Sequence, residues 1–192
     1  MSALRLNLGC GRDIVPGWIN VDRVALPGVE VIADLNDCAR TRLPFDDDSV
    51  GEIKLTHVIE HIPDSLGLMA ELHRIAHRDA RVTLRLPYGA SDDAWEDPTH
   101  VRAYFEGSFG YFSQPYYWRA DYGYRGDWQP EQVVLYVPVA ECVGQSMDVI
   151  RARVRRERNL VLEMEATLRA VKPIREPRRE LIVAPAVAIL PV

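Results

Sequence analysis

Two glycines and two aspartates near the start of the chain have the residue types and the order of a nucleotide-binding site. Gly9 and Gly11 follow an alternating apolar run over residues 4–8 and let the backbone turn without a Cβ atom in the way. Asp22 and Asp34 each close a further apolar run. One carboxylate at a strand end can accept both ribose hydroxyls, and the next can accept the exocyclic amine of adenine. These four residues predict an adenosine-containing ligand.

The glycine motif is shorter than the fingerprint of dinucleotide-binding folds. That fingerprint reads Gly-x-Gly-x-x-Gly and places an acidic residue about 20 positions further on. Here the third glycine is absent, and Asp22 follows Gly9 at a shorter interval. An NAD-dependent or nucleotide-sugar enzyme of the Rossmann type is therefore disfavoured, although it stays open as an alternative.

Short alternating runs must supply the elements that position these residues. Apolar residues at every second position predict a strand ending at Asp22 and strands over residues 4–8, 29–34, 50–56, 82–86, 132–139 and 160–171. Helical spacing predicts helices over 64–77, with Asp64 as the N-cap, and over 143–154. The interval between Asp22 and Asp34 leaves no room for a crossover helix. The sequence predicts an α/β fold with a Rossmann-like, mostly parallel sheet and reduced helices on one edge.

Residues 88–129 differ from the rest of the chain, because they hold most of the aromatic side chains and show no clean period. We interpret them as an aromatic lid inserted over the carboxyl ends of the strands, where ligands of open α/β sheets bind. The aromatic cluster is expected to form the core of this lid. Stacking of the same rings on a planar or sugar acceptor is the alternative.

Length and composition fit a single domain over residues 1–192. With 47% hydrophobic and 27% charged residues, the chain can bury a sizeable core, which we place at 3–87 and 130–172, ahead of a tail at 173–192. The net charge of -5 disfavours a broad basic surface for nucleic acid. Scattered cysteines without a Cys-x-x-Cys pair, no signal peptide and no apolar span of about 20 residues predict a cytoplasmic protein outside the membrane.

Four motifs occur in order along the chain. They are Asn-Leu-Gly-Cys-Gly at 7–11, Gly-Trp-Ile-Asn-Val-Asp at 17–22, Leu-Pro-Phe at 43–45 and His-Val-Ile-Glu-His at 57–61. Together they resemble the class I S-adenosylmethionine-dependent methyltransferases, and in particular small members of that class. The resemblance covers residues 4–112 and implies S-adenosylmethionine as cofactor, a seven-stranded sheet and an antiparallel C-terminal strand.

The resemblance also implies which residues bind the cofactor. The glycine loop would lie against S-adenosylmethionine, with Asp22 at the ribose, Asp34 near the adenine and Thr56 near the methionine portion. The full set of predicted cofactor-binding residues is Asn7, Gly9, Cys10, Gly11, Asp22, Asp34, Leu35, Thr56, His57, Val58 and His61.

The segment Asp97-Pro98-Thr99-His100 is the candidate for catalysis. Small methyltransferases of this group carry a similar Asp-Pro-Thr-His followed by aromatic residues. Methyl transfer mostly requires alignment of the acceptor, together with removal of a proton from a hydroxyl or protonated amine. His100 could be that base, with Asp97 beside it. The alternative is that both residues brace the lid by hydrogen bonds.

The segment 57–61 also matches His-x-x-Glu-His, the pattern of inverted zinc proteases. That pattern needs five residues on one helix and a third ligand, whereas here it begins at a strand end with Pro63 close behind. We therefore predict no metal and keep the metalloprotease as a minor alternative. His61 is expected to pack or cap locally, and Glu60 to point to solvent.

Two further groups are interpreted as structural. Cys10 is expected to fill the glycine turn as a small residue, because no base lies beside it in sequence. His73 and His77 lie four apart on the predicted helix, and without a third ligand we expect them to be solvated.

The methyl acceptor and the partners are not readable from the sequence. The acceptor oxygen or nitrogen could belong to a glycan, a small metabolite, a nucleobase or a protein. An arginine-rich stripe over 151–158 is expected to be a solvated face, with nucleic acid as the alternative. The apolar stretch 181–192 could form a homodimer or dock another partner, and a cofactor-binding interaction module without catalysis is the non-enzymatic alternative.

Overall fold

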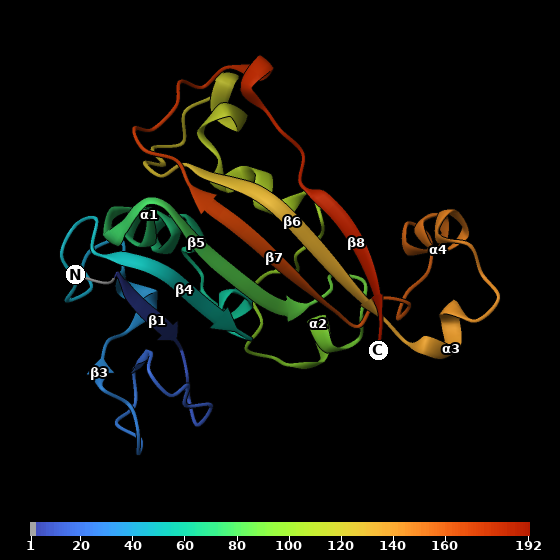
Figure 1. Cartoon of the computed structure of the whole chain (residues 1–192), viewed down its shortest axis with the longest axis horizontal. Helices are drawn as coiled ribbons and strands as arrows, with labels where there is room; N and C mark the ends of the chain where they lie inside the picture. Colours follow the sequence, from blue (N-terminus) through green and yellow to red (C-terminus); the bar gives the residue numbers. More distant parts are fainter. Residues whose placement is uncertain (1–2) are drawn as a thin grey trace.

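One mixed sheet runs through the protein with the strand order β3-β2-β1-β4-β5-β7-β6-β8 (Figure 1). The computed structural model describes residues 3–192. The strands are β1 (Leu4–Leu8), β2 (Ile19–Asp22), β3 (Val31–Ile32), β4 (Val50–Thr56), β5 (Ala76–Pro87), β6 (Trp128–Val137), β7 (Glu163–Ala170) and β8 (Ala186–Pro191). Strand β7 is antiparallel to β5 and β6, whereas the other pairs are parallel. The mostly parallel sheet with an antiparallel seventh strand is confirmed, but that strand is not the C-terminal one, because β8 adds an eighth strand parallel to β6.

Helices are few and short around this sheet. In the described part of the chain they are α1 (Ser65–Ile75), α2 (Asp93–Glu96), α3 (Val139–Cys142) and α4 (Met147–Val154), with 3-10 helices η1 (Leu35–Asp37), η2 (Ile59–His61), η3 (Ser108–Phe112), η4 (Gln114–Trp118) and η5 (Arg179–Leu181). Between β1 and β3 the chain forms only turns and extended segments. The predicted reduction of helices at this edge is confirmed.

Helix α1 packs against β5 and starts where the sequence predicts. The Asp64 carboxylate accepts the N–H of Gly67 at 2.8 Å, an N-cap that stabilises a helix by about 1 kcal/mol. The helix ends at Ile75, earlier than its apolar spacing suggests. Ala76 pairs with Val50 and starts β5 with no loop in between, so sheet pairing outcompetes another helical turn.

The expectation that His73 and His77 are both solvated is wrong for His73. His73, on α1, is buried, and its Nε2 lies 3.0 Å from the carbonyl oxygen of Val171. Its ring packs edge-on against Trp128 with 5.8 Å between the ring centroids. Burial lowers the pKa of His73. His77 lies beyond the end of α1, on β5, so the two histidines do not share a helix face.

Strand β6 begins earlier than the predicted strand at 132–139. Pro130 breaks the alternation in the sequence and hides the first part of the strand. In the structure the register between β6 and β7 shifts between Pro130 and Gln132, which lets a residue without an N–H stay in the sheet.

Residues 88–127 connect β5 to β6 and form the inserted segment. Its first part borders the strand ends, since the Val101 N–H donates to the carbonyl of Glu60 at 2.9 Å. Helices η3 and η4 lie elsewhere, η3 against β6 and η4 against η5 (Figure 1). Tyr104, Phe109 and Phe112 are buried, which confirms an aromatic core. Only the first part of the segment therefore adjoins the strand ends that a lid would cover.

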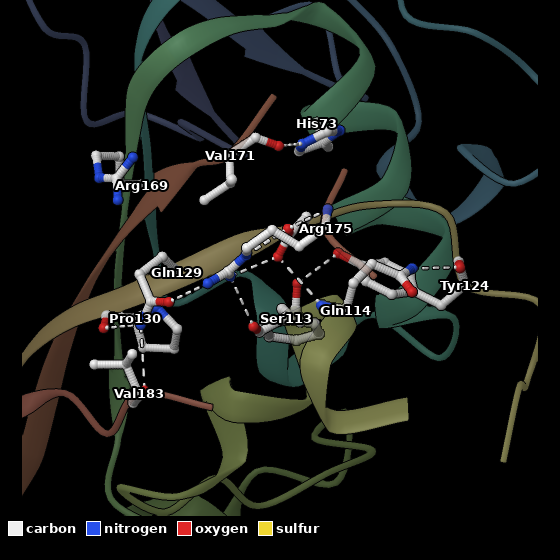
Figure 2. Close-up of polar contacts among 12 residues, drawn as sticks. His73, Ser113, Gln114, Tyr124, Gln129, Pro130, Arg169, Val171, Arg175 and Val183 are labelled. Carbon is white, nitrogen blue, oxygen red and sulfur yellow. Dashed lines mark hydrogen bonds and ion pairs between the residues drawn. The ribbon is translucent and has the colours of Figure 1, made fainter. Parts of the chain in front are cut away.

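Arg175 anchors the chain that follows β7. Its guanidinium donates to Asp127 through Nε and Nη2, both at 2.8 Å, and its backbone N–H donates to the same carboxylate at 3.0 Å. Figure 2 shows the same guanidinium reaching Gln129 and Ser113, at 2.8 and 3.1 Å. Gln114 adds a backbone N–H to Asp127 at 3.2 Å. The fully buried Asp127 thus joins the start of β6, the inserted segment and the tail.

The apolar tail is part of the sheet. Residues 186–191 form β8 and pair in parallel with β6 of the same chain, so this stretch is not a free docking segment. The homodimer remains a prediction. Among residues 3–192, none of the helices has the length and apolar character needed to cross a membrane.

Candidate functional site

A cavity of about 420 Å³ opens at the carboxyl ends of β1, β2 and β4. It is lined by Gly9, Asp22, Arg23, Ala33, Asp34, Leu35, Asn36, His57, Val58, His61, Ile62 and Thr99. Most of the predicted cofactor-binding residues are in this wall. Because parallel strands end at the same edge of the sheet, turns far apart in the sequence converge here.

The turn after β1 requires glycine at its first position. Gly9 has a φ of +64°, and a Cβ atom there would lie 2.6 Å from the side chain of Val58. Both the backbone conformation and the close approach exclude a larger residue. Gly11 has a φ of +50°, and its N–H points to the Asp22 carboxylate at 2.8 Å. The turn therefore brings the ends of β1, β2 and β4 together.

The Asp22 carboxylate is oriented by the backbone. One oxygen accepts the N–H of Gly11 at 2.8 Å, and the other accepts the N–H of Val24 at 2.9 Å. An ionised carboxylate offers about four lone-pair sites, so each oxygen keeps capacity for a further donor. A vicinal diol matches that remaining capacity.

Asp34 also lines the cavity and is the N-cap residue of η1. Its Oδ1 accepts both the backbone N–H and the side-chain amide of Asn36, at 3.0 and 2.8 Å. This leaves Oδ2 as the oxygen available to a ligand. Asn36 and Arg23 also line the cavity. The sequence did not predict either of them as a cavity residue.

Several predicted cofactor-binding residues support the wall without lining it. Asn7 is buried and donates to Asn20 Oδ1 at 2.9 Å and to the carbonyl of Asp13 at 2.7 Å, which fixes the loop after β1. Cys10 is buried, and burial followed by the charge of nearby Asp22 raises the pKa of its thiol. A neutral thiol agrees with its interpretation as a small filling residue. Thr56 and Gly11 are likewise absent from the cavity lining.

His57 lies between two carboxylates at the end of β4. Its Nε2 is 2.9 Å from Glu163 Oε1, and its Nδ1 is 3.5 Å from Glu60 Oε1. These carboxylates, Glu60 first, raise the pKa of His57. Glu163, on β7, also accepts from Arg85 at 2.8 Å. Nothing local in the sequence marks Glu163, because it reaches this place only through strand pairing.

A second cavity of about 670 Å³ adjoins the first. Its lining is His57, His61, Pro87, Asp93, Glu96, Asp97, Pro98 and His100. His57 and His61 belong to both linings. Ligands in the two cavities would therefore meet at these two imidazoles.

The predicted pair of Asp97 and His100 is not a hydrogen-bonded dyad. Asp97 Oδ2 and His100 Nε2 are 3.9 Å apart, too far for a hydrogen bond. Asp97 instead accepts the hydroxyl of Thr99 at 2.6 Å and its N–H at 2.7 Å, which lower the pKa of Asp97. His100 Nδ1 lies 3.2 Å from the carbonyl oxygen of Ala94. Asp97 and His100 therefore both brace this segment by hydrogen bonds.

The expectation that Glu60 points to solvent is wrong. Glu60 is 2% exposed and sits on η2, a 3-10 turn directly behind His57. His57 has a φ of +53°, so the segment 57–61 is not one α-helix, and the zinc-protease pattern lacks the geometry it needs. Glu60 faces inward because the turn after β4 places it against the inserted segment, whereas His57 stays exposed and His61 half-buried.

The basic stripe is partly neutralised by neighbours. Arg153 pairs with Glu141 at 2.7 Å and Glu157 at 2.8 Å, and Arg158 pairs with Asp92 at 2.6 Å. These contacts agree with the interpretation as a solvated face. A phosphate-binding role for the remaining arginines stays an untested alternative.

The fold was compared with solved structures. A SAM-dependent methyltransferase from Archaeoglobus fulgidus matches with a TM-score of 0.61 at 14% identity, over 88% of this chain and 86% of that one. YcgJ from Bacillus subtilis gives 0.54 at 16% identity, over 88% and 92%. A SAM-dependent methyltransferase from Aquifex aeolicus gives 0.52 at 15% identity, over 88% and 82%. No protein-family model and no curated protein matches the sequence. Strand order, antiparallel β7 and these likenesses together show that the chain has the fold of the class I S-adenosylmethionine-dependent methyltransferases.

Proposed function

We propose that the protein is an S-adenosylmethionine-dependent methyltransferase that methylates an oxygen or nitrogen acceptor. The observation that carries the proposal is the pair of adjoining cavities that share His57 and His61. One has the glycine turn and the oriented Asp22 carboxylate, and the other is open to a second ligand. A transferase needs two such sites in contact.

The first cavity would take the cofactor. Asp22 has free acceptor capacity for the ribose hydroxyls, and Asp34 Oδ2 for the adenine amine. Val58, His57 and His61 would then lie at the methionine end, where the second cavity begins. Bound there, the cofactor supplies a methyl group on sulfonium sulfur, whose carbon–sulfur bond breaks as the acceptor oxygen or nitrogen bonds to carbon.

The second cavity would hold the acceptor. His100 borders it, and the Ala94 carbonyl beside Nδ1 favours the tautomer in which Nε2 carries a lone pair. That lone pair can take the acceptor proton, which is the base role predicted for His100, with Asp97 acting on Thr99 and so on the segment rather than on His100. The chemical class of the acceptor stays open, and a cytoplasmic location is part of the proposal.

Calorimetric titration tests the cofactor assignment. We expect S-adenosylmethionine and S-adenosylhomocysteine to bind and NAD not to bind. Asp22→Ala should weaken S-adenosylhomocysteine binding about 10- to 100-fold, since hydrogen bonds to a charged group contribute roughly 1.5–3 kcal/mol each. Binding of NAD alone would overturn the proposal.

Asp37→Ala is the matched control for this titration. Asp37 lies on η1 next to the cavity wall, but its carboxylate bonds to Arg40 and Thr41 and does not line the cavity. Its substitution should leave the affinity within about twofold. Equal weakening by both variants would show that loss of local charge, not the Asp22 contact, explains the result.

A further inference from the structure

Glu60 is buried without hydrogen bonds to either carboxylate oxygen. A charged neighbour is His57, whose Nδ1 lies 3.5 Å from Oε1 and forms an ion pair with Glu60 when the imidazole is protonated, but no hydrogen bond joins the two side chains. A buried carboxylate without donors is costly, and native proteins rarely keep one without a compensating partner. The ion pair with His57 leaves both Glu60 oxygens free to bind a further group in this pocket.

Two histidines lie beside this carboxylate. Glu60, His61 and His100 each place one candidate ligand atom within 4.8 Å of the others. The rings of His61 and His100 meet edge to face with 4.6 Å between their centroids. Two imidazoles and one carboxylate are a common donor set for divalent transition metals.

Hydrogen bonds fix which nitrogen of His61 is free. The hydroxyl of Thr99 has one proton, which it donates in a hydrogen bond to the ionised Asp97 carboxylate at 2.6 Å. The Thr99 oxygen, 2.9 Å from His61 Nδ1, therefore accepts, and His61 carries its proton on Nδ1. Its Nε2 is left with an unshared pair.

The same holds for His100. Its Nδ1 lies 3.2 Å from the carbonyl oxygen of Ala94, which can only accept, so the proton is on Nδ1 and Nε2 is free. Metal-binding histidines usually donate the N–H of the ring nitrogen that does not bind the metal to a carbonyl, a carboxylate or water. Both imidazoles are thus held in the tautomer that a metal ion requires.

We infer that Glu60, His61 and His100 bind one divalent transition-metal ion, with Zn²⁺ the ion that suits the donor set. His61 and His100 both line the second cavity, so the ion would have open positions toward the acceptor. If the proposed function holds, the ion would lower the pKa of an acceptor hydroxyl. The Nε2 lone pair of His100 cannot bind the ion and take the acceptor proton at once, so the metal would replace the base role proposed above for His100. The sequence-based expectation of a metal-free site would also be replaced.

Metal titration of the chelator-treated chain of residues 1–192 tests this inference. Calorimetry with Zn²⁺ and visible absorption with Co²⁺ should show one ion per chain. Glu60→Gln, His61→Ala and His100→Ala should each weaken binding at least 100-fold, and Thr99→Val about 10-fold through the tautomer of His61. His77→Ala, a histidine away from this cluster, should leave affinity unchanged.

Three results would overturn the inference. These are no stoichiometric binding by the wild-type chain, full affinity in Glu60→Gln and His100→Ala, or an equal loss in His77→Ala. Circular dichroism of each metal-free variant shows that it is folded, and Glu60→Gln is conservative enough to remain so. Failure here is separable from failure of the proposed function, because S-adenosylhomocysteine binding is measured on the same samples.

Discussion

Asp127 and Glu60 are both buried carboxylates, but their hydrogen bonding is opposite. Asp127 is fully buried and accepts from Arg175 and from the backbone of Gln114. Glu60 is 2% exposed, and its carboxylate has no hydrogen bond. Equal burial therefore does not mean equal roles. Asp127 has its donors within the fold, whereas we propose that the Glu60 carboxylate takes a further partner from outside the chain.

Neutralising Asp127 should have the largest effect on stability. Asp127→Asn leaves the guanidinium of Arg175 without its anion, and breaking a buried pair costs about 3–5 kcal/mol. Urea unfolding followed by circular dichroism measures the free energy of unfolding. Glu176→Gln is the control, because its pair with Arg178 is exposed and contributes under about 1 kcal/mol. If both variants lose a similar free energy of unfolding, the buried pair of Asp127 and Arg175 contributes no more to stability than the exposed pair of Glu176 and Arg178.

Neutralising Glu60 should have a smaller effect of opposite sign. In the metal-free protein, Glu60→Gln removes a buried charge that lacks donors, and we expect the free energy of unfolding to rise by roughly 1 kcal/mol. The same urea titration at pH 7 measures it. A loss comparable to that of Asp127→Asn would mean that Glu60 is a structural carboxylate after all.

The smallest effect concerns His73, a buried ionisable group in the same region as Asp127. Burial lowers the pKa of His73 below its ordinary 6.5, so the unfolded chain binds its proton first as the pH falls. Its contribution to stability is complete above pH 6.5 and is lost as the pH falls through the lowered pKa. His73→Gln should therefore lose less stability than the wild type between pH 7 and pH 5. If His73→Gln and the wild type lose the same free energy of unfolding between pH 7 and pH 5, His73 does not contribute to the loss of stability in acid.

Much of the cavity at the ends of β1, β2 and β4 was predictable because its signals are local. A strand, a glycine turn and an acid at a strand end are each written within a few residues, as for Gly9 and Asp22. The burial of Glu60 and the contact from Glu163 were not predictable, because they arise from turns and strands that meet only in the folded sheet. The pairing of β8 with β6 was missed for the same reason, whereas the start of β6 was missed because Pro130 breaks the local alternation.

The position of β7 between β5 and β6 constrains how the chain can fold as it is made. Strand β6 leaves the ribosome first, but the sheet has no place for it until β7 has been synthesised and paired with β5. Asp127 likewise waits for Arg175, many residues later. The residues that line the two cavities lie in β1 to β5, their turns and the start of the inserted segment, and can assemble early, whereas the outer half closes only near the end of synthesis.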